Sequence, residues 1–241
     1  LSLSFTDPMI NDTPNLVGGS IFYTFQGAST QYYYPLDIRV VGGSLMWGRR
    51  FRWPDDYFRG QWGFQVTQKQ YDGDDEDLNL YTGGLTKSVG FNLSQVISRD
   101  SRDRPEFTTS GSRVTWSTTF SGGPLGGNED FFKNVLNMDF YTPLVSKFVL
   151  VNSAKLGVIS SLASENDSTS IIPYDERFIM GGNGIPYGNM LRGYSDNSIG
   201  PVSSSGSAIG GRSMIKFTSE LRFALSENPV IYLLAFAEMG N

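Results

Sequence analysis

The sequence of 241 residues contains no histidine and no cysteine. Without these residue types the chain cannot form a Ser-His-Asp triad, a Cys-His pair or an imidazole acid–base catalyst. It also lacks the side chains of the usual zinc and iron sites and of a disulfide framework. Any chemistry would have to use carboxylates, hydroxyls, lysine, arginine or the backbone. These absences exclude several enzyme types. We expect no catalytic residue, no metal site and no cofactor, and we predict that the protein is not an enzyme.

Long apolar runs and an excess of positive charge are missing as well. No window approaches the roughly 18 consecutive apolar residues of a membrane-spanning helix, so the sequence excludes a helical span but not a β-barrel. The net charge of −5 argues against an extended basic surface for nucleic acid. We therefore expect no nucleic-acid partner.

What the sequence does contain is a strict alternation of apolar and polar residues. In one such segment, Val114, Trp116 and Phe120 alternate with Arg113 and Thr115. Because successive side chains of a strand point to opposite faces of a sheet, this period of two predicts strands. About ten such segments lie near residues 1–7, 18–27, 37–48, 58–71, 87–99, 111–120, 132–142, 145–162, 211–225 and 229–239. We therefore predict an all-β protein, and we expect no amphipathic helix of useful length to interrupt the strands.

Two all-β architectures share this alternation, a soluble sandwich and a transmembrane antiparallel β-barrel. Several segments are as long as tilted membrane strands, which need about 9–11 residues, whereas soluble strands usually have about five or six. Short or proline-marked connections alternate with longer polar ones near residues 28–36, 72–86, 121–131 and 163–210. Short turns on one side and long loops on the other are typical of outer-membrane barrels. The pattern thus favours the transmembrane barrel over a soluble carbohydrate-binding sandwich.

The longest connection, residues 163–210, is polar and rich in glycine and serine, and a structureless stretch of this length is usually functional. Its glycines Gly182, Gly184 and Gly188 could suggest a loop that cradles phosphate. However, no strand-to-helix unit surrounds them and no Lys-Ser or Lys-Thr follows, so their spacing argues against that interpretation. The centre of the loop carries a more specific motif.

The motif Leu191-Arg192-Gly193-Tyr194, preceded by Gly181-Gly182, resembles the RGF or RGY motif on the long inserted loop of a superfamily of outer-membrane barrels. This superfamily includes BamA-like assembly factors, TamA-like relatives and two-partner secretion transporters. Further segments that resemble it are Leu1–Pro8, Gly48–Arg50, Trp53–Phe58, Ser98–Asp103 and Phe236–Gly240. Together these matches identify the chain as the central part of a BamA-like barrel.

The resemblance implies that residues 1–241 are a fragment of one transmembrane barrel domain, about ten of about sixteen strands, with the loop 163–210 folded into the lumen. If the connections 72–86 and 163–210 are external, the first strand starts on the outer side and the last strand runs outward. We therefore expect strands of the same barrel beyond both ends. Periplasmic POTRA repeats are expected upstream, and they are absent from this sequence.

In such barrels the motif arginine pairs with acidic residues on nearby strands, which implies a contact of Arg192 with Glu220 and Glu238. Glu238 belongs to Phe236–Gly240, which resembles the family's F-x-D-x-G motif except that Glu replaces Asp. A guanidinium between two carboxylates would form charge-assisted hydrogen bonds suited to a poorly solvated lumen. The residues alone leave two alternatives open, namely three independently solvated charges, or an acid–base pair of Glu220 and Glu238 of the glycosidase type.

The implied function is that of an insertase, which folds and inserts β-barrel proteins into the outer membrane of a Gram-negative bacterium. A lateral seam between the first and last strands of the barrel would offer an unpaired edge to a client strand. The expected partners are nascent outer-membrane β-barrel proteins, periplasmic chaperones, accessory subunits of an assembly complex and outer-membrane lipid. The alternatives are a TamA-like or two-partner secretion translocation barrel, and a passive porin or structural barrel.

Two other groups of residues allow more than one interpretation. The acidic stretch could suggest calcium, but its spacing lacks the glycine and terminal glutamate of an EF-hand loop, which favours a solvated external loop. It comprises Asp72, Asp74, Asp75, Glu76 and Asp77. Several aromatic residues near predicted strand ends fit either an interfacial belt or ordinary sheet positions. They are Tyr32, Tyr33, Tyr34, Trp47, Trp53, Tyr57 and Tyr81.

Overall fold

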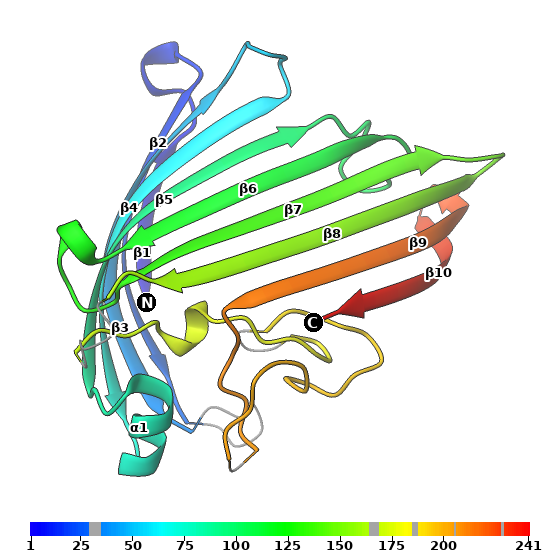
Figure 1. The fold of residues 1–241 in the computed structure, drawn as a ribbon. Helices are drawn as coiled ribbons and strands as arrows, with labels where there is room; N and C mark the ends of the chain where they lie inside the picture. Colours follow the sequence, from blue (N-terminus) through cyan, green and yellow to red (C-terminus); the bar gives the residue numbers. More distant parts are fainter. Residues whose placement is uncertain (29–34, 164–168, 185–187, 205, 228) are drawn as a thin grey trace.

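Ten antiparallel strands form one strongly curved sheet in the computed structural model of the chain (Figure 1). Each strand pairs with its neighbours in sequence, from β1 at one edge to β10 at the other, and the described strands do not close into a ring. The structure describes residues 1–28, 35–163, 169–184, 188–204, 206–227 and 229–241. The strands are β1 (Ser2–Asp7), β2 (Asn15–Gln26), β3 (Asp37–Arg50), β4 (Phe58–Asp72), β5 (Lys87–Asp100), β6 (Gly111–Ser121), β7 (Phe131–Pro143), β8 (Phe148–Ser161), β9 (Ser213–Glu227) and β10 (Val230–Gly240).

The strands coincide with the segments predicted from the alternation, so the prediction of an all-β, antiparallel fold is confirmed. Their bounds differ from the predicted ones by a few residues. For example, β8 begins at Phe148 and not at Val145, because residues 144–147 form a turn in which the Leu144 N–H donates to the Phe148 carbonyl. No helix in the described part of the chain is both long and apolar enough to cross a membrane.

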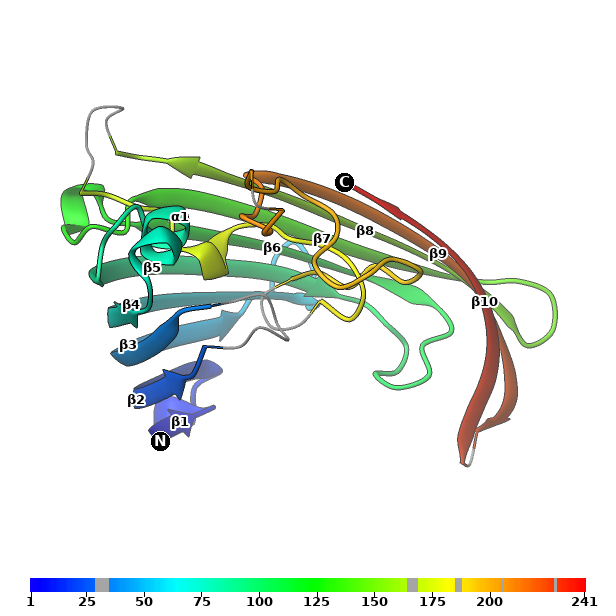
Figure 2. The same cartoon turned by 90° about the horizontal axis from the view of Figure 1, so that it is seen from below.

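The two faces of the sheet differ as the alternation predicts. The concave face carries mostly polar and charged side chains, and Figure 2 shows the segment between β8 and β9 lying inside the curve. The convex face exposes large apolar side chains, among them Leu3, Phe5, Ile21, Phe25, Leu45, Trp47, Phe64, Leu93, Trp116, Phe140, Phe217 and Leu233. A contiguous apolar surface of this extent marks contact with a membrane or another protein. The convex face is therefore suited to an apolar environment.

The buried core lies between the concave face and the segment that connects β8 to β9. We call this segment, residues 163–210, the inner loop. One buried cluster joins loop residues to β7, β8 and β9, and it consists of Phe131, Ile159, Ile172, Phe178, Met180, Leu191 and Met214. Leu191 of the predicted motif is 0% exposed there, and burying one such side chain stabilises the fold by about 1.5–3 kcal/mol. Apolar packing therefore holds the inner loop against the sheet.

A short helix, α1 (Asp75–Thr82), lies in the connection between β4 and β5, where we had expected a solvated acidic loop. Three acidic residues occupy its first turn, where negative charge interacts favourably with the helix dipole. Leu78 and Tyr81 on its opposite side are buried, and the Tyr81 ring packs edge-on against Tyr174 of the inner loop at a centroid distance of 4.9 Å. The described acidic side chains of this stretch do not gather into a group that could hold a metal ion.

The exposure of the aromatic side chains distinguishes the two interpretations that the sequence left open, an interfacial belt and ordinary sheet positions. Trp47 and Tyr57 are about half exposed, and Trp53 is largely exposed. Trp47 stacks on Trp62 on the convex face, with ring centroids 4.9 Å apart, as in an interfacial belt. Tyr81 is instead a buried core residue. Tyr32, Tyr33 and Tyr34 lie outside the described residues.

Candidate functional site

The glycines of the inner loop set the course of the motif. Gly182 has a φ of +49°, and a Cβ at this position would collide with the Asp196 carboxylate. The Gly182 carbonyl accepts from the Leu191 N–H, and its own N–H donates to the Tyr194 carbonyl, at 3.2 and 3.0 Å. Because both ends of the motif bond to Gly182, the motif forms a turn in which Leu191 packs into the core and Arg192 reaches β9 and β10.

The structure brings Arg192, Glu220 and Glu238 together. Arg192 Nη2 donates to Glu220 Oε1 at 2.8 Å and to Glu238 Oε1 at 2.7 Å. The backbone N–H of Arg192 donates to Glu238 Oε2 at 2.9 Å, so this carboxylate binds the motif at two points. The two glutamates lie on the same face because Glu220 pairs with Phe236 in the register of β9 and β10, two residues from Glu238. The alternative of three independently solvated charges does not describe this geometry.

Further cations and a hydroxyl complete the surroundings of the two glutamates. Arg222 Nη2 and Nε donate to Glu220 Oε2 at 2.6 and 2.9 Å. Lys216 Nζ lies 3.4 Å from Glu238 Oε1, to which the Thr218 hydroxyl donates at 3.2 Å. The side chains of Glu238 and Glu220 are only 4% and 11% exposed. Both carboxylates are therefore engaged as ion-pair acceptors, which favours an anchoring role over the acid–base alternative.

Phe236 and Gly240 also take part in the contact between the inner loop and β10, although only Glu238 of this segment was predicted to contact Arg192. The Arg192 guanidinium carbon lies 3.6 Å from the centroid of the Phe236 ring, which is a close cation–π contact. A Cβ at Gly240 would lie 2.5 Å from the sulfur of Met180 in the inner loop. The segment thus supplies a ring, a carboxylate and space for the loop, and we call this set of interactions the Arg192 contact.

Gly193 and Tyr194, the last two motif residues, make few side-chain contacts of this kind. Gly193 has a φ of +86°, and no atom lies within 4 Å of a Cβ built on it. The Tyr194 side chain is 52% exposed. The positive φ of Gly193 turns the chain away from β10 after Arg192, so that Tyr194 contributes through its backbone carbonyl.

A second charged contact, which the sequence gave no reason to expect, holds the start of the inner loop. Lys69 Nζ on β4 lies 3.0 Å from Asp175 Oδ2 in the short 3-10 helix η3 (Tyr174–Glu176), and 3.4 Å from Glu129 Oε1. The Ser88 hydroxyl donates to Glu129 Oε1 at 2.6 Å. The side chains of Lys69 and Glu129 are 9% and 2% exposed. We call this group the Lys69 contact.

The electrostatics of the Lys69 contact reflect its depth. Burial raises the pKa of the Glu129 carboxyl, although the positive charge of Lys69 and the hydrogen bond from Ser88 act in the opposite direction. A neighbouring pair, Lys133 Nζ and Glu176 Oε2 at 2.8 Å, fixes the other end of η3 to β7. Lys69 and Lys133 could be placed on the polar phase of their strands from the sequence, but no motif relates them to η3.

The chain is similar to known proteins over nearly its whole length. A model of the Omp85 superfamily domain matches residues 1–241. The chain is 28% identical over 244 residues to the outer membrane protein assembly factor BamA of Nitratidesulfovibrio vulgaris, a match that covers 98% of this chain and 28% of that protein. It is also similar to the crystal structure of BamA from Haemophilus ducreyi lacking POTRA domains 1–3. That match has a TM-score of 0.78 and 21% identity, and covers 100% of this chain and 48% of the other.

The chain thus spans less than half the length of each of these two proteins. Within that part, the predicted likeness to a BamA barrel is confirmed, and the ten-stranded antiparallel sheet has the barrel fold of its structural neighbour. Because the family model matches from the first residue to the last, the chain belongs to the Omp85 superfamily.

Proposed function

We propose that this chain forms part of the barrel wall and the inner loop of an outer-membrane assembly factor, a protein that folds and inserts other β-barrel proteins. The observation that carries the proposal is the Arg192 contact, which holds the inner loop against β9 and β10 in a member of the Omp85 superfamily. The similarity to an outer membrane protein assembly factor supports the same role. The exposed apolar convex face supports a location in the outer membrane of a Gram-negative bacterium.

The proposed mechanism requires no covalent chemistry and no nucleotide. An unpaired strand edge presents a row of N–H and C=O groups, on which a client strand can add by main-chain hydrogen bonds. We assign this step to a lateral seam between the first and last strands of the barrel. The clients are nascent outer-membrane β-barrel proteins, delivered by periplasmic chaperones and accessory subunits. By holding the inner loop inside the curve, Arg192 keeps the wall in the shape that the seam requires.

The test replaces Arg192 in the intact outer-membrane protein. Arg192→Ala leaves two largely buried carboxylates without their central partner, at a cost of about 3 kcal/mol, the lower end for breaking a buried pair, because Arg192 is 31% exposed. Arg192→Lys keeps the charge but loses the planar fork and its stacking on Phe236. We expect a strong loss of client assembly for the alanine variant, a smaller loss for the lysine variant, and faster cleavage of the inner loop by proteinase K in both.

The matched control is Arg212→Ala, which removes an exposed arginine just after the inner loop. Unchanged client assembly and unchanged loop protection in Arg192→Ala would contradict the proposal. A passive pore would give steady ion conductance and normal client assembly in a strain that lacks the protein. A TamA-like or two-partner secretion barrel would support transport of its own substrate and leave general assembly unaffected.

A further inference from the structure

The concave face is positively charged although the whole chain is negatively charged. Among the described side chains, the strand register places eight cations and four anions on this face. The cations are Arg50, Arg59, Lys69, Arg113, Lys133, Lys155, Lys216 and Arg222, and the anions are Asp100, Asp139, Glu220 and Glu238. The net charge of the chain is −5. The described strands therefore carry more positive than negative charge on this face.

The inner loop and the wall acids account for only part of this excess. Lys69, Lys133, Lys216 and Arg222 each lie within an ion pair described above. Lys155 donates to the Asn189 side chain of the loop at 2.6 Å. The remaining three cations are the exposed arginines Arg50, Arg59 and Arg113. In the described part of the chain, no acidic side chain forms a salt bridge with any of the three, and Arg50 Nε donates to the Asp56 carbonyl at 2.8 Å.

These three arginines, together with Arg49, line one hollow of about 520 Å³, between the β1–β2 turn and the concave side of β3 to β6. Arg50 and Arg59 are direct cross-strand partners, an arrangement in which like charges repel. The hollow is also lined by the apolar side chains of Pro8, Met9, Pro14, Leu16 and Val96, and none of its described lining residues is acidic. Its volume is typical of ligand sites, which measure about 300–1,000 Å³.

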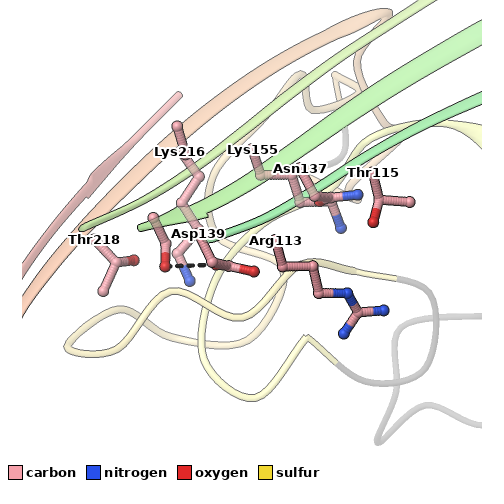
Figure 3. A pocket seen from close by; sticks show the side chains of 9 residues that line it. Arg113, Thr115, Asn137, Asp139, Lys155, Lys216 and Thr218 are labelled. Carbon is pink, nitrogen blue, oxygen red and sulfur yellow. Dashed lines mark hydrogen bonds between the residues drawn. The ribbon is translucent and has the colours of Figure 1, made fainter. Parts of the chain in front are cut away.

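Arg113 lies where this hollow meets a second one, of about 340 Å³, which Figure 3 shows. Asp139 in the second hollow accepts a hydrogen bond from the Ser153 hydroxyl at 2.7 Å. The Arg113 guanidinium extends away from Asp139 in that view, and Arg113 also lines the first hollow. Asp100, which pairs with Arg113 in the register, is instead bound to Arg102 at 2.8 Å.

We propose that the hollow bounded by Arg50, Arg59 and Arg113 binds an acidic, partly apolar segment of extended polypeptide. The carboxylates of such a segment match three guanidinium groups, which favour bidentate hydrogen bonds. Its apolar side chains match Met9, Leu16 and Val96, which a free phosphate ion would leave uncovered. The hollow opens on the concave face, opposite the apolar convex surface, so a polypeptide has access where a membrane lipid does not. The inference does not depend on the assembly role.

The test uses the full-length outer-membrane protein in nanodiscs of neutral phosphatidylcholine. The probe is a fluorescent peptide of alternating glutamate and leucine, compared with one in which glutamine replaces glutamate. We expect saturable binding of the acidic peptide that weakens with salt, and much weaker binding of the glutamine peptide. The double variant Arg59→Gln/Arg113→Gln is expected to weaken binding by roughly tenfold or more per arginine, from the loss of charge-assisted hydrogen bonds.

The matched control is Arg39→Gln/Arg52→Gln, which removes the same charge from the convex face and from the β3–β4 turn. It should bind the peptide as the unaltered protein does. The unaltered protein and the two double variants should have the same melting temperature. Equal peptide binding by both double variants would overturn the proposal. So would full displacement of the peptide by inorganic phosphate at constant ionic strength, or binding seen only in nanodiscs with anionic lipid, because these results identify a phosphate or a headgroup site.

Discussion

The two charged contacts of the inner loop have opposite polarity. In the Arg192 contact the loop supplies the cation, and the wall supplies Glu220 and Glu238. In the Lys69 contact the wall supplies the cation, and the loop supplies Asp175. Because each contact is selective for the opposite sign of charge, exchanging the two parts of the loop would place like charges together. The pair of contacts thus fixes the direction and the register of the loop, which one contact alone would not do.

The two contacts also differ in depth. Lys69 and Glu129 are buried almost completely, whereas Arg192 is 31% exposed and stacks on a ring that is itself half exposed. A buried pair contributes little net stability while intact, but it becomes costly when one partner is removed. When a partly exposed arginine is removed, water can replace some of the hydrogen bonds that it donated. We therefore expect the Lys69 contact to govern whether the structure folds, and the Arg192 contact to govern how firmly the loop is held.

The largest effect is expected from Lys69→Met, which keeps the length of the side chain and removes its charge. Glu129, which is buried, and Asp175, which is 33% exposed, then lack their cation, and we expect a cost of about 3–5 kcal/mol, mainly from Glu129. The free energy of unfolding in urea, measured on the protein in detergent micelles, should fall accordingly. Lys87→Met, at an exposed position on β5, is the control and should change little. Adding Glu129→Gln to Lys69→Met should recover part of the loss, and no recovery would show that Glu129 is not the unpaired group.

A smaller effect is expected from Glu238→Gln, which keeps the shape of the side chain and removes the charge. Arg192 and Lys216 both lose a charged acceptor, but Glu220 still holds Arg192, so we expect a loss of about 1–3 kcal/mol. Cleavage of the inner loop by proteinase K should become faster, while the sheet remains folded by circular dichroism. Glu238→Asp tests the arm length, because the shorter side chain cannot reach both the backbone N–H and Nη2 as in the present geometry. Equal protection in all three proteins would show that Glu238 does not hold the loop.

Much of the fold follows from the sequence because side chains along a strand alternate between its two faces with a period of two residues. Each strand could be placed, and its two faces assigned, from neighbours along the chain alone. The helix α1 was missed because it is only eight residues long, and its buried residues Leu78 and Tyr81 pack on parts distant in sequence. Local patterns carry no information about such contacts.

In the candidate site, too, some residues could be named from the sequence and others could not. Arg192, Glu220 and Glu238 could be named because each belongs to a strand pattern or to a motif that resembles a known family. Lys69 and Asp175 are 106 residues apart, and neither stands in a motif, so only the folded chain brings them together. Phe236 was visible in the motif, but its role depends on how the Arg192 side chain lies over the ring. Sequence thus locates the residues of one contact, and only the structure reveals the other.

The smallest expected effect isolates the ring from the charges in the Arg192 contact. Phe236→Leu keeps an apolar side chain on β10 and removes the cation–π contact, which is worth about 0.5–1 kcal/mol at a partly exposed site. Phe223→Leu, on the convex face of β9, is a matched control that removes a ring without touching Arg192. If the ring acts on the guanidinium, Phe236→Leu should accelerate loop cleavage in the unaltered protein but not in Arg192→Ala. An equal effect in both backgrounds would mean that Phe236 contributes only by packing, and the contact would then rest on its charges alone.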